Sequence, residues 1–393
     1  MKKIGIDIRS AGGEKAGKGW FTFNIVRELL ALDKKNHYIL YTQGGIAGFE
    51  EFKNVEMRIV EAKGFFWHRE VAKDVVKEGL DVFYAPTSYI IPALLPKPTK
   101  PNAPKTILTI HDLVAFLFTS NNRKAQFIER FFLKRALKKA SGITCVSENT
   151  KKDLKGSFPE LTAKTDPTIT PCAPAQDYAP IEKTEKNLAN LQEFINKTHL
   201  PTKFFLAVGT IEPRKNYQTL IQAFALAHKQ NQNLHLVIVG GKGWGGEKEA
   251  IEQMIQDNYL QKYVHELGYL TTKTINRLYN LAQALVFPSH YEGFGMPLIE
   301  AMAANCPVIA SNTSSIPEVV GDAAIQCDPN EPTQFAEAML KIAASSQASS
   351  QATPPANSNL RQDLINKGRI QSKRFTWEKS ADKLLETIYN VTT

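Results

Sequence analysis

The strongest constraint on the fold is an alternation of short apolar runs with longer amphipathic stretches, which occurs twice along the 393 residues. In the first half, runs such as KIGIDI, HYILYT and TILTIHD are typical of buried strands, and stretches such as 20–32 are typical of amphipathic helices. Such alternation predicts a parallel sheet with helices on both faces. Because the pattern restarts near residue 200 with KFFLAVG, we predict an α/β chain of two doubly wound, Rossmann-like domains with a ligand cleft between them.

The predicted organisation is an N-terminal domain, a linker and a C-terminal domain over residues 1–180, 181–200 and 201–374. The stretch 159–198 is assigned to the end of the first domain and the linker because it has weak periodicity and many Pro, Thr, Lys and Asn residues. Residues 343–359 are low in complexity and predict a flexible loop. An amphipathic pattern over 375–393 predicts a final helix, which we expect to pack back on the N-terminal domain.

The net charge of +9 lies entirely in residues 1–199, because residues 200–393 hold 17 Lys+Arg and 17 Asp+Glu. A basic half indicates an anionic partner, such as phosphates, a membrane surface or nucleic acid. A solvated basic face without a specific partner explains the same charge.

The cysteines, histidines and apolar runs restrict the compartment and the kind of site. Four cysteines without a C-x-x-C pair are typical of reduced thiols in a cytosolic protein, and no Cys/His spacing indicates zinc. The N-terminus lacks the apolar core of a signal peptide, and the most apolar stretch, 106–120, is too short to span a bilayer. We therefore expect a soluble, cytoplasmic protein, with a peripheral position at the inner face of the membrane left open.

A glycine-rich segment, GGEKAGKG over residues 12–19, follows a predicted strand and precedes a predicted helix. It matches a P-loop except at its last position, where Gly19 replaces the Ser or Thr that ligands magnesium. Bare backbone N–H groups in such a turn also suit a phosphate in general. A turn that only needs positive φ is the structural alternative.

Two groups of charged residues follow predicted strands of the second half. In AVGTIEPRKN (207–216), Arg214 and Lys215 lie just past a strand, where adjacent cations suit a diphosphate. A surface turn with two solvated cations is the alternative.

The second group is SHYEGFGMPLIEAMA (289–303), in which a turn leads into a helix with Pro297 near its first position. The amides of Phe294 and Gly295 and the helix N-terminus would favour an anion. Glu292 and Glu300, eight positions apart, could accept hydrogen bonds from a sugar and a ribose, although each could also be a simple partner of the helix dipole. Further on, Ser315 with Glu318 predicts a capping box.

These segments together resemble the retaining glycosyltransferases of family 4, which have the GT-B fold. PSHYEGFGMPLIEAMA carries the E-x7-E signature, GTIEPRKN resembles the diphosphate-binding segment, and TIHD resembles the histidine strand of the first domain. VSENTKKDL, AGKGWF, PVIASNTSSIPEVVGDAA and RFTWEKSA resemble further segments of that family, in the expected order. The resemblance covers nearly the whole chain.

The resemblance implies a donor-binding set formed by Arg214, Lys215, Glu292, Gly293, Phe294, Gly295 and Glu300. Glu292 would bind sugar hydroxyls of the donor, Glu300 would bind the ribose, and Lys215 would neutralise the leaving diphosphate. His111 would face the donor sugar, so the implied catalytic residues are His111, Glu292 and Lys215. Gly17, Lys18 and Gly19 would form an acceptor or phosphate loop in the first domain.

The implied reaction is transfer of a sugar, with mannose as the favoured guess, from a nucleotide-diphosphate sugar such as GDP-mannose or a UDP-sugar. The acceptor would be a glycan or a lipid-linked hydroxyl, as in polysaccharide biosynthesis, and the anomeric configuration would be retained. No D-x-D motif occurs, so neither a metal nor another cofactor is expected. Since the resemblance gives the basic first domain the acceptor, a nucleic-acid partner is not expected.

The sequence departs from the family pattern at three places. Thr210 stands where many members have an arginine, and we expect Arg214 to compensate. Asn305 replaces the glycine usual after the helix, which is a mild change because Asn tolerates the left-handed conformation. PCAPAQD (171–177) lacks the glycine usual in the interdomain turn.

The stretch 123–140 interleaves phenylalanines with cations, as in a helix that lies on an anionic membrane. A core-facing helix with a solvated basic face is the alternative.

For the whole chain, the alternatives to a glycosyltransferase are a GT-B sugar phosphorylase, a sugar-nucleotide epimerase, a P-loop-like nucleotidase and a non-catalytic binder.

Overall fold

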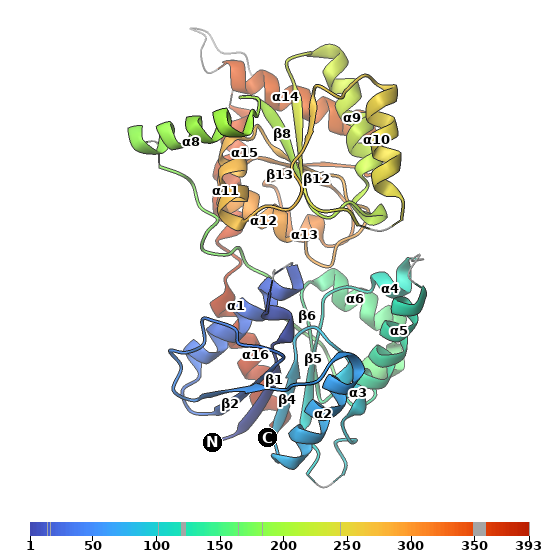
Figure 1. Ribbon diagram of the computed structural model, residues 1–393. Helices are drawn as coiled ribbons and strands as arrows, with labels where there is room; N and C mark the ends of the chain where they lie inside the picture. Colours follow the sequence, from blue (N-terminus) through green and yellow to red (C-terminus); the bar gives the residue numbers. More distant parts are fainter. Residues whose placement is uncertain are drawn as a thin grey trace. The chain divides into compact units, whose positions relative to one another are not determined.

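The computed structural model describes residues 1–392 except 14, 16, 101, 119–122, 164, 183, 244 and 349–358. The chain forms two compact units (Figure 1): unit 1 is Met1–Cys172 with Thr376–Thr393, and unit 2 is Ala173–Phe375. Within the described part of the chain, every helix is too short or too polar to cross a membrane.

Unit 1 is built on a seven-stranded parallel sheet with the order β3-β2-β1-β4-β5-β6-β7. Its strands are β1 Lys3–Asp7, β2 His37–Thr42, β3 Val55–Ile59, β4 Val82–Ala85, β5 Lys105–Ile110, β6 Gly142–Cys145 and β7 Thr168–Ile169. The strand order reverses between β1 and β4, and the loops that leave these two strands diverge. A crevice is therefore expected at their carboxyl ends.

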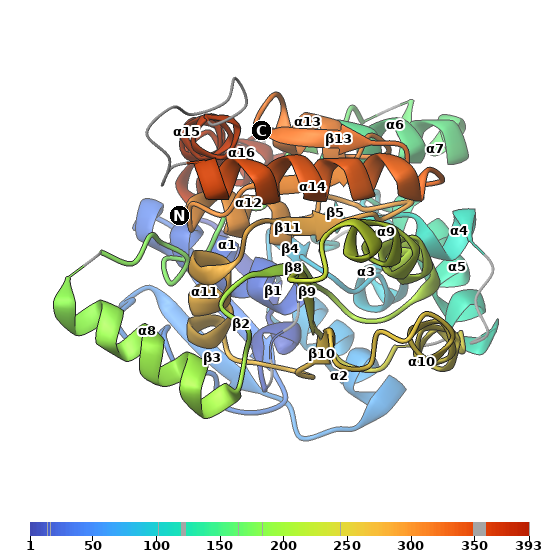
Figure 2. The ribbon, with the colours of Figure 1, turned by 90° about the horizontal axis from the view of Figure 1, so that it is seen from above.

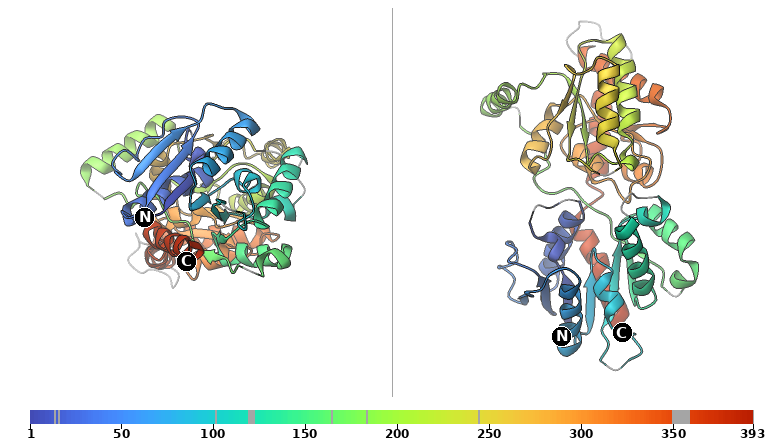
Figure 3. Two further views of the ribbon diagram at one scale, coloured as in Figure 1. Left: turned by 90° about the horizontal axis from the view of Figure 1, so that it is seen from below. Right: turned by 45° about the vertical axis from the view of Figure 1, so that its right-hand side comes forward.

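The helices of unit 1 cover both faces of this sheet. They are α1 Gly17–Leu32, α2 Gly64–Lys77, α3 Ile90–Leu94, α4 Val114–Leu117, α5 Arg123–Leu137, α6 Glu148–Ser157, α7 Pro159–Thr162 and α16 Trp377–Thr392. α16 lies beside α1 (Figure 3). Its apolar side chains Leu384 and Ile388 are fully buried, and its Trp377 ring meets the Phe21 ring of α1 with centroids 5.7 Å apart.

Unit 2 repeats the same topology in a six-stranded parallel sheet with the order β10-β9-β8-β11-β12-β13. Its strands are β8 Phe204–Val208, β9 His235–Val239, β10 Val264–Glu266, β11 Leu285–Phe287, β12 Val308–Ser311 and β13 Ala324–Cys327. Here the order reverses between β8 and β11, which pair through Leu206 and Leu285. Both charged motifs of the second half follow these two strands.

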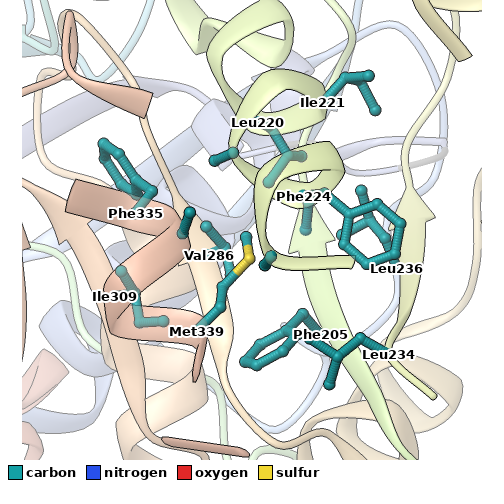
Figure 4. Packing of buried hydrophobic residues seen from close by; sticks show 14 of the residues in the cluster. Phe205, Leu220, Ile221, Phe224, Leu234, Leu236, Val286, Ile309, Phe335 and Met339 are labelled. Carbon is teal, nitrogen blue, oxygen red and sulfur yellow. The ribbon is translucent and has the colours of Figure 1, made fainter. Parts of the chain in front are cut away.

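The helices of unit 2 enclose an apolar core. They are α8 Glu185–Thr198, α9 Tyr217–Gln230, α10 Glu247–Asp257, α11 Thr272–Leu281, α12 Met296–Ala303, α13 Ile316–Val320, α14 Pro332–Ala348 and α15 Leu360–Ser372. Figure 4 shows Phe224 of α9 and Met339 of α14 packed over Phe205 of β8, and all three side chains are buried. The sequence period of α9, with apolar residues on one face, explains this contact.

Three local predictions differ from the structure. The predicted linker contains α8, which begins at the N-cap Thr184 and buries none of its residues, so its weak periodicity hid a helix that contributes little to the core. α8 lies beside α11 (Figure 2), where Arg277 stacks on Phe194 at 5.6 Å. The predicted loop 343–359 is wrong for its first six residues, which continue α14 because Ile342 and Ala343 are buried; residues 349–358 lie outside the described residues.

The third difference concerns Ser315, which does not form the predicted capping box. Its hydroxyl instead donates to the carbonyl oxygens of Glu292 (2.9 Å) and Phe294 (3.2 Å). The Ser315 hydroxyl therefore bonds to residues that are distant in the sequence and does not cap its own helix.

Candidate functional site

The loop after β8 presents Arg214 and Lys215 through a short 3-10 turn, Pro213–Lys215. Asn216 ends this turn with φ of 57°, and its side-chain amide donates to the carbonyl oxygens of Pro288 (3.0 Å) and Pro329 (2.8 Å). The loop is thereby fixed against the end of β11. Sequence reasoning missed Asn216, although an Asn between a turn and a helix is a signal for the left-handed conformation.

The turn after β11 carries Glu292 and ends at Gly295, the N-cap of α12, with φ of 95°. A Cβ at Gly295 would lie 2.8 Å from the Leu298 side chain, so glycine is required there. Besides Ser315, Ser314 holds this turn, because its hydroxyl donates to the Glu292 carbonyl oxygen (2.6 Å) and accepts from the Glu292 amide (3.1 Å). The position of the Glu292 backbone is therefore set by hydroxyls that lie more than 20 residues away.

These two loops bring the predicted cations and Glu292 into one cluster. The Lys215 ammonium lies 2.6 Å from one Glu292 carboxylate oxygen, and the Arg214 guanidinium lies 2.8 Å from the other. Arg214 also pairs with Glu212 at 2.6 Å. The side chains of Lys215 and Glu292 are only 11% and 7% exposed, so this is a largely desolvated cluster of two cations and two carboxylates. It excludes the alternative of a surface turn with two solvated cations.

Burial and charge act on this cluster in opposite directions. Burial alone would raise the pKa of Glu292, but Arg214 and Lys215 outweigh it and hold the pKa below its ordinary value. Burial lowers the pKa of Lys215, and the Glu292 carboxylate opposes that effect. A buried lysine needs a nearby anion to stay charged, and Glu292 supplies it here. Glu212 and Glu292 were not foreseen as these counter-ions.

A cavity of about 10 Å³ lies beside Lys215, between the ends of β8 and β11. Its lining includes Val208, Tyr217 and Phe287, and the Lys215 ammonium is 4.9 Å from the centre of the Phe287 ring. The ammonium therefore sits at the point where the strand order of unit 2 reverses, which is where doubly wound sheets bind ligands.

Glu300 lies apart from the cationic cluster in its contacts. It is 7% exposed, and the Tyr279 hydroxyl donates to its carboxylate at 3.3 Å. Burial raises the pKa of Glu300 to about 7, although hydrogen bonds from Tyr279 and Tyr178 partly oppose this. Neither tyrosine was predicted as part of the site.

In unit 1, His111 follows β5 and is 7% exposed. Its Nε2 lies 2.7 Å from the Pro86 carbonyl oxygen, which can only accept, so Nε2 carries the proton and Nδ1 keeps the lone pair. Burial lowers the pKa of His111 to about 4, and Lys18 adds to the effect. The imidazole is thus neutral at pH 7.

The predicted loop Gly17-Lys18-Gly19 forms the first turn of α1 and lies near the same strand end. The Lys18 ammonium is 3.3 Å from the carboxylate of Asp112, the residue that follows His111. This ion pair links the loop to the chain segment that carries His111. A Cβ at Gly19 would lie 2.5 Å from the Ser10 carbonyl oxygen, so close packing already requires this glycine. The residues before it, 14 and 16, lie outside the described residues.

The structure thus gathers the predicted residues into two groups, one in each unit: Arg214, Lys215 and Glu292 with the 293–295 turn in unit 2, and His111 with Lys18 in unit 1. That the Phe294 and Gly295 amides face a ligand stays a prediction. Asn305 has φ of 61°, so it adopts the left-handed conformation that was expected of it from the sequence. Among the described residues, His, Cys, Asp and Glu do not gather in groups of three or more that could hold a metal ion.

Comparison with known proteins adds a second line of evidence. A family model described as "Glycosyl transferases group 1" matches residues 190–371. The chain is 29% identical over 278 residues to the O-antigen chain mannosyltransferase B of Escherichia coli, covering 70% of this chain and 67% of that protein. It is 26% identical over 285 residues to the serotype-specific mannosyltransferase WbdA of Escherichia coli, covering 72% of this chain but only 33% of WbdA.

Two solved structures share the fold over essentially the whole chain. Sucrose-phosphate synthase from Thermosynechococcus elongatus has a TM-score of 0.77 at 19% identity, with 100% of this chain and 99% of that chain covered. HepE from Anabaena, in complex with UDP and glucose, has a TM-score of 0.73 at 17% identity, with 99% of this chain and 100% of that chain covered. Both likenesses concern the fold.

Two parallel-sheet units of this topology, matched over the whole chain by these solved structures, form a GT-B fold. The family model places residues 190–371, most of unit 2, in the group 1 glycosyltransferases, and the relatives extend the similarity to about 70% of the chain.

Proposed function

We propose that the protein is a retaining family 4 enzyme that transfers mannose from a nucleotide-diphosphate sugar to a hydroxyl of a glycan or lipid-linked acceptor. The observation that carries this proposal is the buried cluster of Arg214, Lys215 and Glu292 at the strand-order reversal of unit 2. The names of the relatives, an O-antigen chain mannosyltransferase and a serotype-specific mannosyltransferase, favour mannose and polysaccharide synthesis. The UDP in the HepE complex supports a nucleotide-sugar donor.

The chemistry needs compensation for the negative charge that builds on the departing diphosphate. The Lys215 ammonium has three N–H donors, of which Glu292 receives one, and the others are suited to phosphate oxygens. Arg214 and the N-terminus of α12 add positive charge beside it. Such fixed charges act without reorganisation in a desolvated site, so we expect metal-independent catalysis.

His111 is proposed to face the donor sugar, as the family resemblance implies. With Nε2–H held by Pro86 and a pKa of about 4, it offers a neutral Nδ1 lone pair. It can therefore accept a hydrogen bond from a sugar hydroxyl, but it is a poor general acid at pH 7.

The proposed function predicts donor binding and turnover that survive metal removal. UDP, GDP, UDP-glucose and GDP-mannose are screened by thermal shift, since a ligand that binds only the folded state raises its melting temperature. We expect one base to stabilise the protein and its nucleotide sugar to be consumed in excess EDTA.

Three outcomes of this screen would favour other enzymes. Phosphate-dependent turnover without nucleotide release would favour the phosphorylase, and conversion of the sugar without transfer would favour the epimerase. Activity that is lost in EDTA and restored only by magnesium would favour the P-loop nucleotidase. Absence of any shift by the four ligands would contradict the proposal.

We further propose that unit 1 contacts an anionic membrane through an aromatic patch, defined as Phe65, Phe66, Phe127 and Phe131. Their side chains are 50%, 65%, 68% and 46% exposed. Phe127 stacks on Phe131, and Phe65 reaches α5 at Phe132, so α2 and α5 share the patch. α5 buries Leu133 and Leu137 in the core, and its phenylalanines at 127 and 131 do not face that core. Arg135 lies over Phe131, so a cation borders the apolar surface.

Liposome flotation tests the membrane contact. We expect the protein to float with vesicles containing phosphatidylglycerol at low salt, and the double variant Phe127→Ser/Phe131→Ser to float several-fold less. Tyr259→Asn, which removes an 85% exposed aromatic ring from unit 2, is the matched control and should float like the wild type. Equal flotation of the double variant, or flotation with neutral vesicles alone, would refute the contact.

A further inference from the structure

Glu300 is held by hydroxyl groups, whereas Glu292 is held by two cations. Tyr279 donates to the Glu300 carboxylate at 3.3 Å, and the Tyr178 hydroxyl also lowers the pKa of this carboxylate. The two tyrosine rings meet edge to face, with centroids 5.9 Å apart, and both side chains are buried. Among the described residues, the groups that lower the pKa of this carboxylate are tyrosine hydroxyls and not cations, and the bond from Tyr279 restricts its orientation.

Tyr178 reaches this position through a short segment that is fastened to α11. We call residues 177–181 the strap. Four hydrogen bonds fasten it: Thr272 Oγ1 to Asp177 Oδ2 (3.0 Å), Ala179 N to Asn276 Oδ1 (3.2 Å), Ile181 N to Asn280 Oδ1 (2.8 Å) and Asn280 Nδ2 to Ala179 O (3.1 Å). Since Tyr279 is itself a residue of α11, one helix sets the positions of both hydroxyls.

We infer that Tyr178 and Tyr279 are positioning residues that aim the Glu300 carboxylate at the ribose hydroxyls of the nucleotide, with the strap holding Tyr178 in place. This inference rests on the proposed function, in which Glu300 binds the ribose. It adds two residues and the strap to the donor site. Without these hydroxyls, the buried carboxylate would rotate more freely, and its pKa would be higher because burial disfavours the ionised form.

The direction of the pH effect follows from the surroundings of Glu300. Burial raises its pKa to about 7, and the hydrogen bonds from Tyr279 and Tyr178 lower it. Cys306 lies near Tyr279, and Asp177 and Tyr269 act on Tyr178. Removing either hydroxyl raises the pKa of Glu300 further, so a larger fraction is protonated at pH 7. A protonated carboxyl is the poorer acceptor for a ribose hydroxyl.

The test compares ligands with and without a ribose. Binding of UDP, GDP and inorganic pyrophosphate is measured by calorimetry at pH 7.0 and 8.5 for Tyr178→Phe, Tyr279→Phe and Asn280→Ala, which loosens the strap without touching Glu300. We expect the Kd of the preferred nucleotide to rise about tenfold at pH 7.0 in each tyrosine variant, and less at pH 8.5. The Kd of pyrophosphate should not change. Asn280→Ala should show a weaker form of the same pattern.

Tyr41→Phe is the matched control, because Tyr41 also donates to a carboxylate, that of Asp74 in unit 1, at 2.9 Å. It should lower the melting temperature without changing nucleotide binding. Unchanged nucleotide affinity in both tyrosine variants, or an equal loss of pyrophosphate affinity, would overturn the inference while leaving the proposed function intact. A wild-type protein that binds neither UDP nor GDP would overturn both. If Tyr279→Phe fails to fold, Tyr178→Phe and Asn280→Ala decide the matter.

Discussion

Lys215→Ala is expected to lower kcat by about two to three orders of magnitude while the protein stays folded. The ammonium is the group placed to compensate charge on the departing diphosphate, because it lies at the strand-order reversal of unit 2 and is only 11% exposed. The fold should persist, since Glu292 keeps Arg214 as its counter-ion at 2.8 Å. Steady-state kinetics with the nucleotide sugar identified by thermal shift gives kcat, and circular dichroism reports the fold.

Lys242→Ala serves as the control for the Lys215 variant. Lys242 is another lysine of unit 2 that pairs with a glutamate, Glu249, but its side chain is 63% exposed. Exposed pairs contribute little, so this variant should match the wild type in both kcat and stability. Near-wild-type kcat for Lys215→Ala would remove the cationic cluster from the proposed mechanism.

The two α/β units could be predicted because each buried strand is a continuous apolar run and each turn between strand and helix has its own local signals. HYILYT coincides with β2, residue for residue, and KIGIDI and TILTIHD lie within one or two residues of β1 and β5. Parallel strands are buried on both faces, which makes their apolar runs easy to recognise. α8 was not predicted, because a helix that buries no residue needs no strong apolar face and so leaves no clear periodicity in the sequence.

The candidate site was predictable as a set of residues but not as a set of contacts. The strand-end positions of Arg214, Lys215 and Glu292 follow from local pattern and from the family resemblance. Their mutual pairing joins residues 77 and 78 positions apart, and no local signal gives such a distance. The same holds for Tyr279 and Glu300. The hydroxyl of Ser315 was misassigned for this reason, because its partners lie 21 and 23 residues away.

The ion pairs with Glu292 also give Arg214 and Lys215 a partner before any donor binds. Two largely buried positive charges beside each other are unfavourable, and Glu292 contacts both. In the ligand-free protein this glutamate is therefore a structural counter-ion. On donor binding, the diphosphate would share the same cations and leave the carboxylate able to accept hydrogen bonds from the sugar.

Glu292→Gln should consequently destabilise the protein by about 3 kcal/mol, the lower end of the range for breaking a buried ion pair. The lower end applies because Arg214 keeps Glu212 at 2.6 Å. Without Glu292, the pKa of Lys215 falls further below its ordinary value, so the loss of stability is largest near neutral pH, where Glu292 is ionised and Lys215 is protonated. It is smaller at high pH, where Lys215 loses its proton, and at low pH, where the wild-type Glu292 is itself protonated. Urea unfolding at several pH values measures both effects.

Inorganic pyrophosphate separates this electrostatic role of Glu292 from sugar binding. In the wild type, pyrophosphate competes with the Glu292 carboxylate for Arg214 and Lys215. In Glu292→Gln, pyrophosphate supplies the negative charge that these two cations have lost. We therefore expect pyrophosphate to raise the melting temperature of the variant more than that of the wild type. Glu249→Gln, which removes an exposed partner of Lys242, should change stability by less than about 0.5 kcal/mol and leave the pyrophosphate response unaltered. A Glu292→Gln protein as stable as the wild type, with the same pyrophosphate response, would show that the two cations do not depend on this carboxylate.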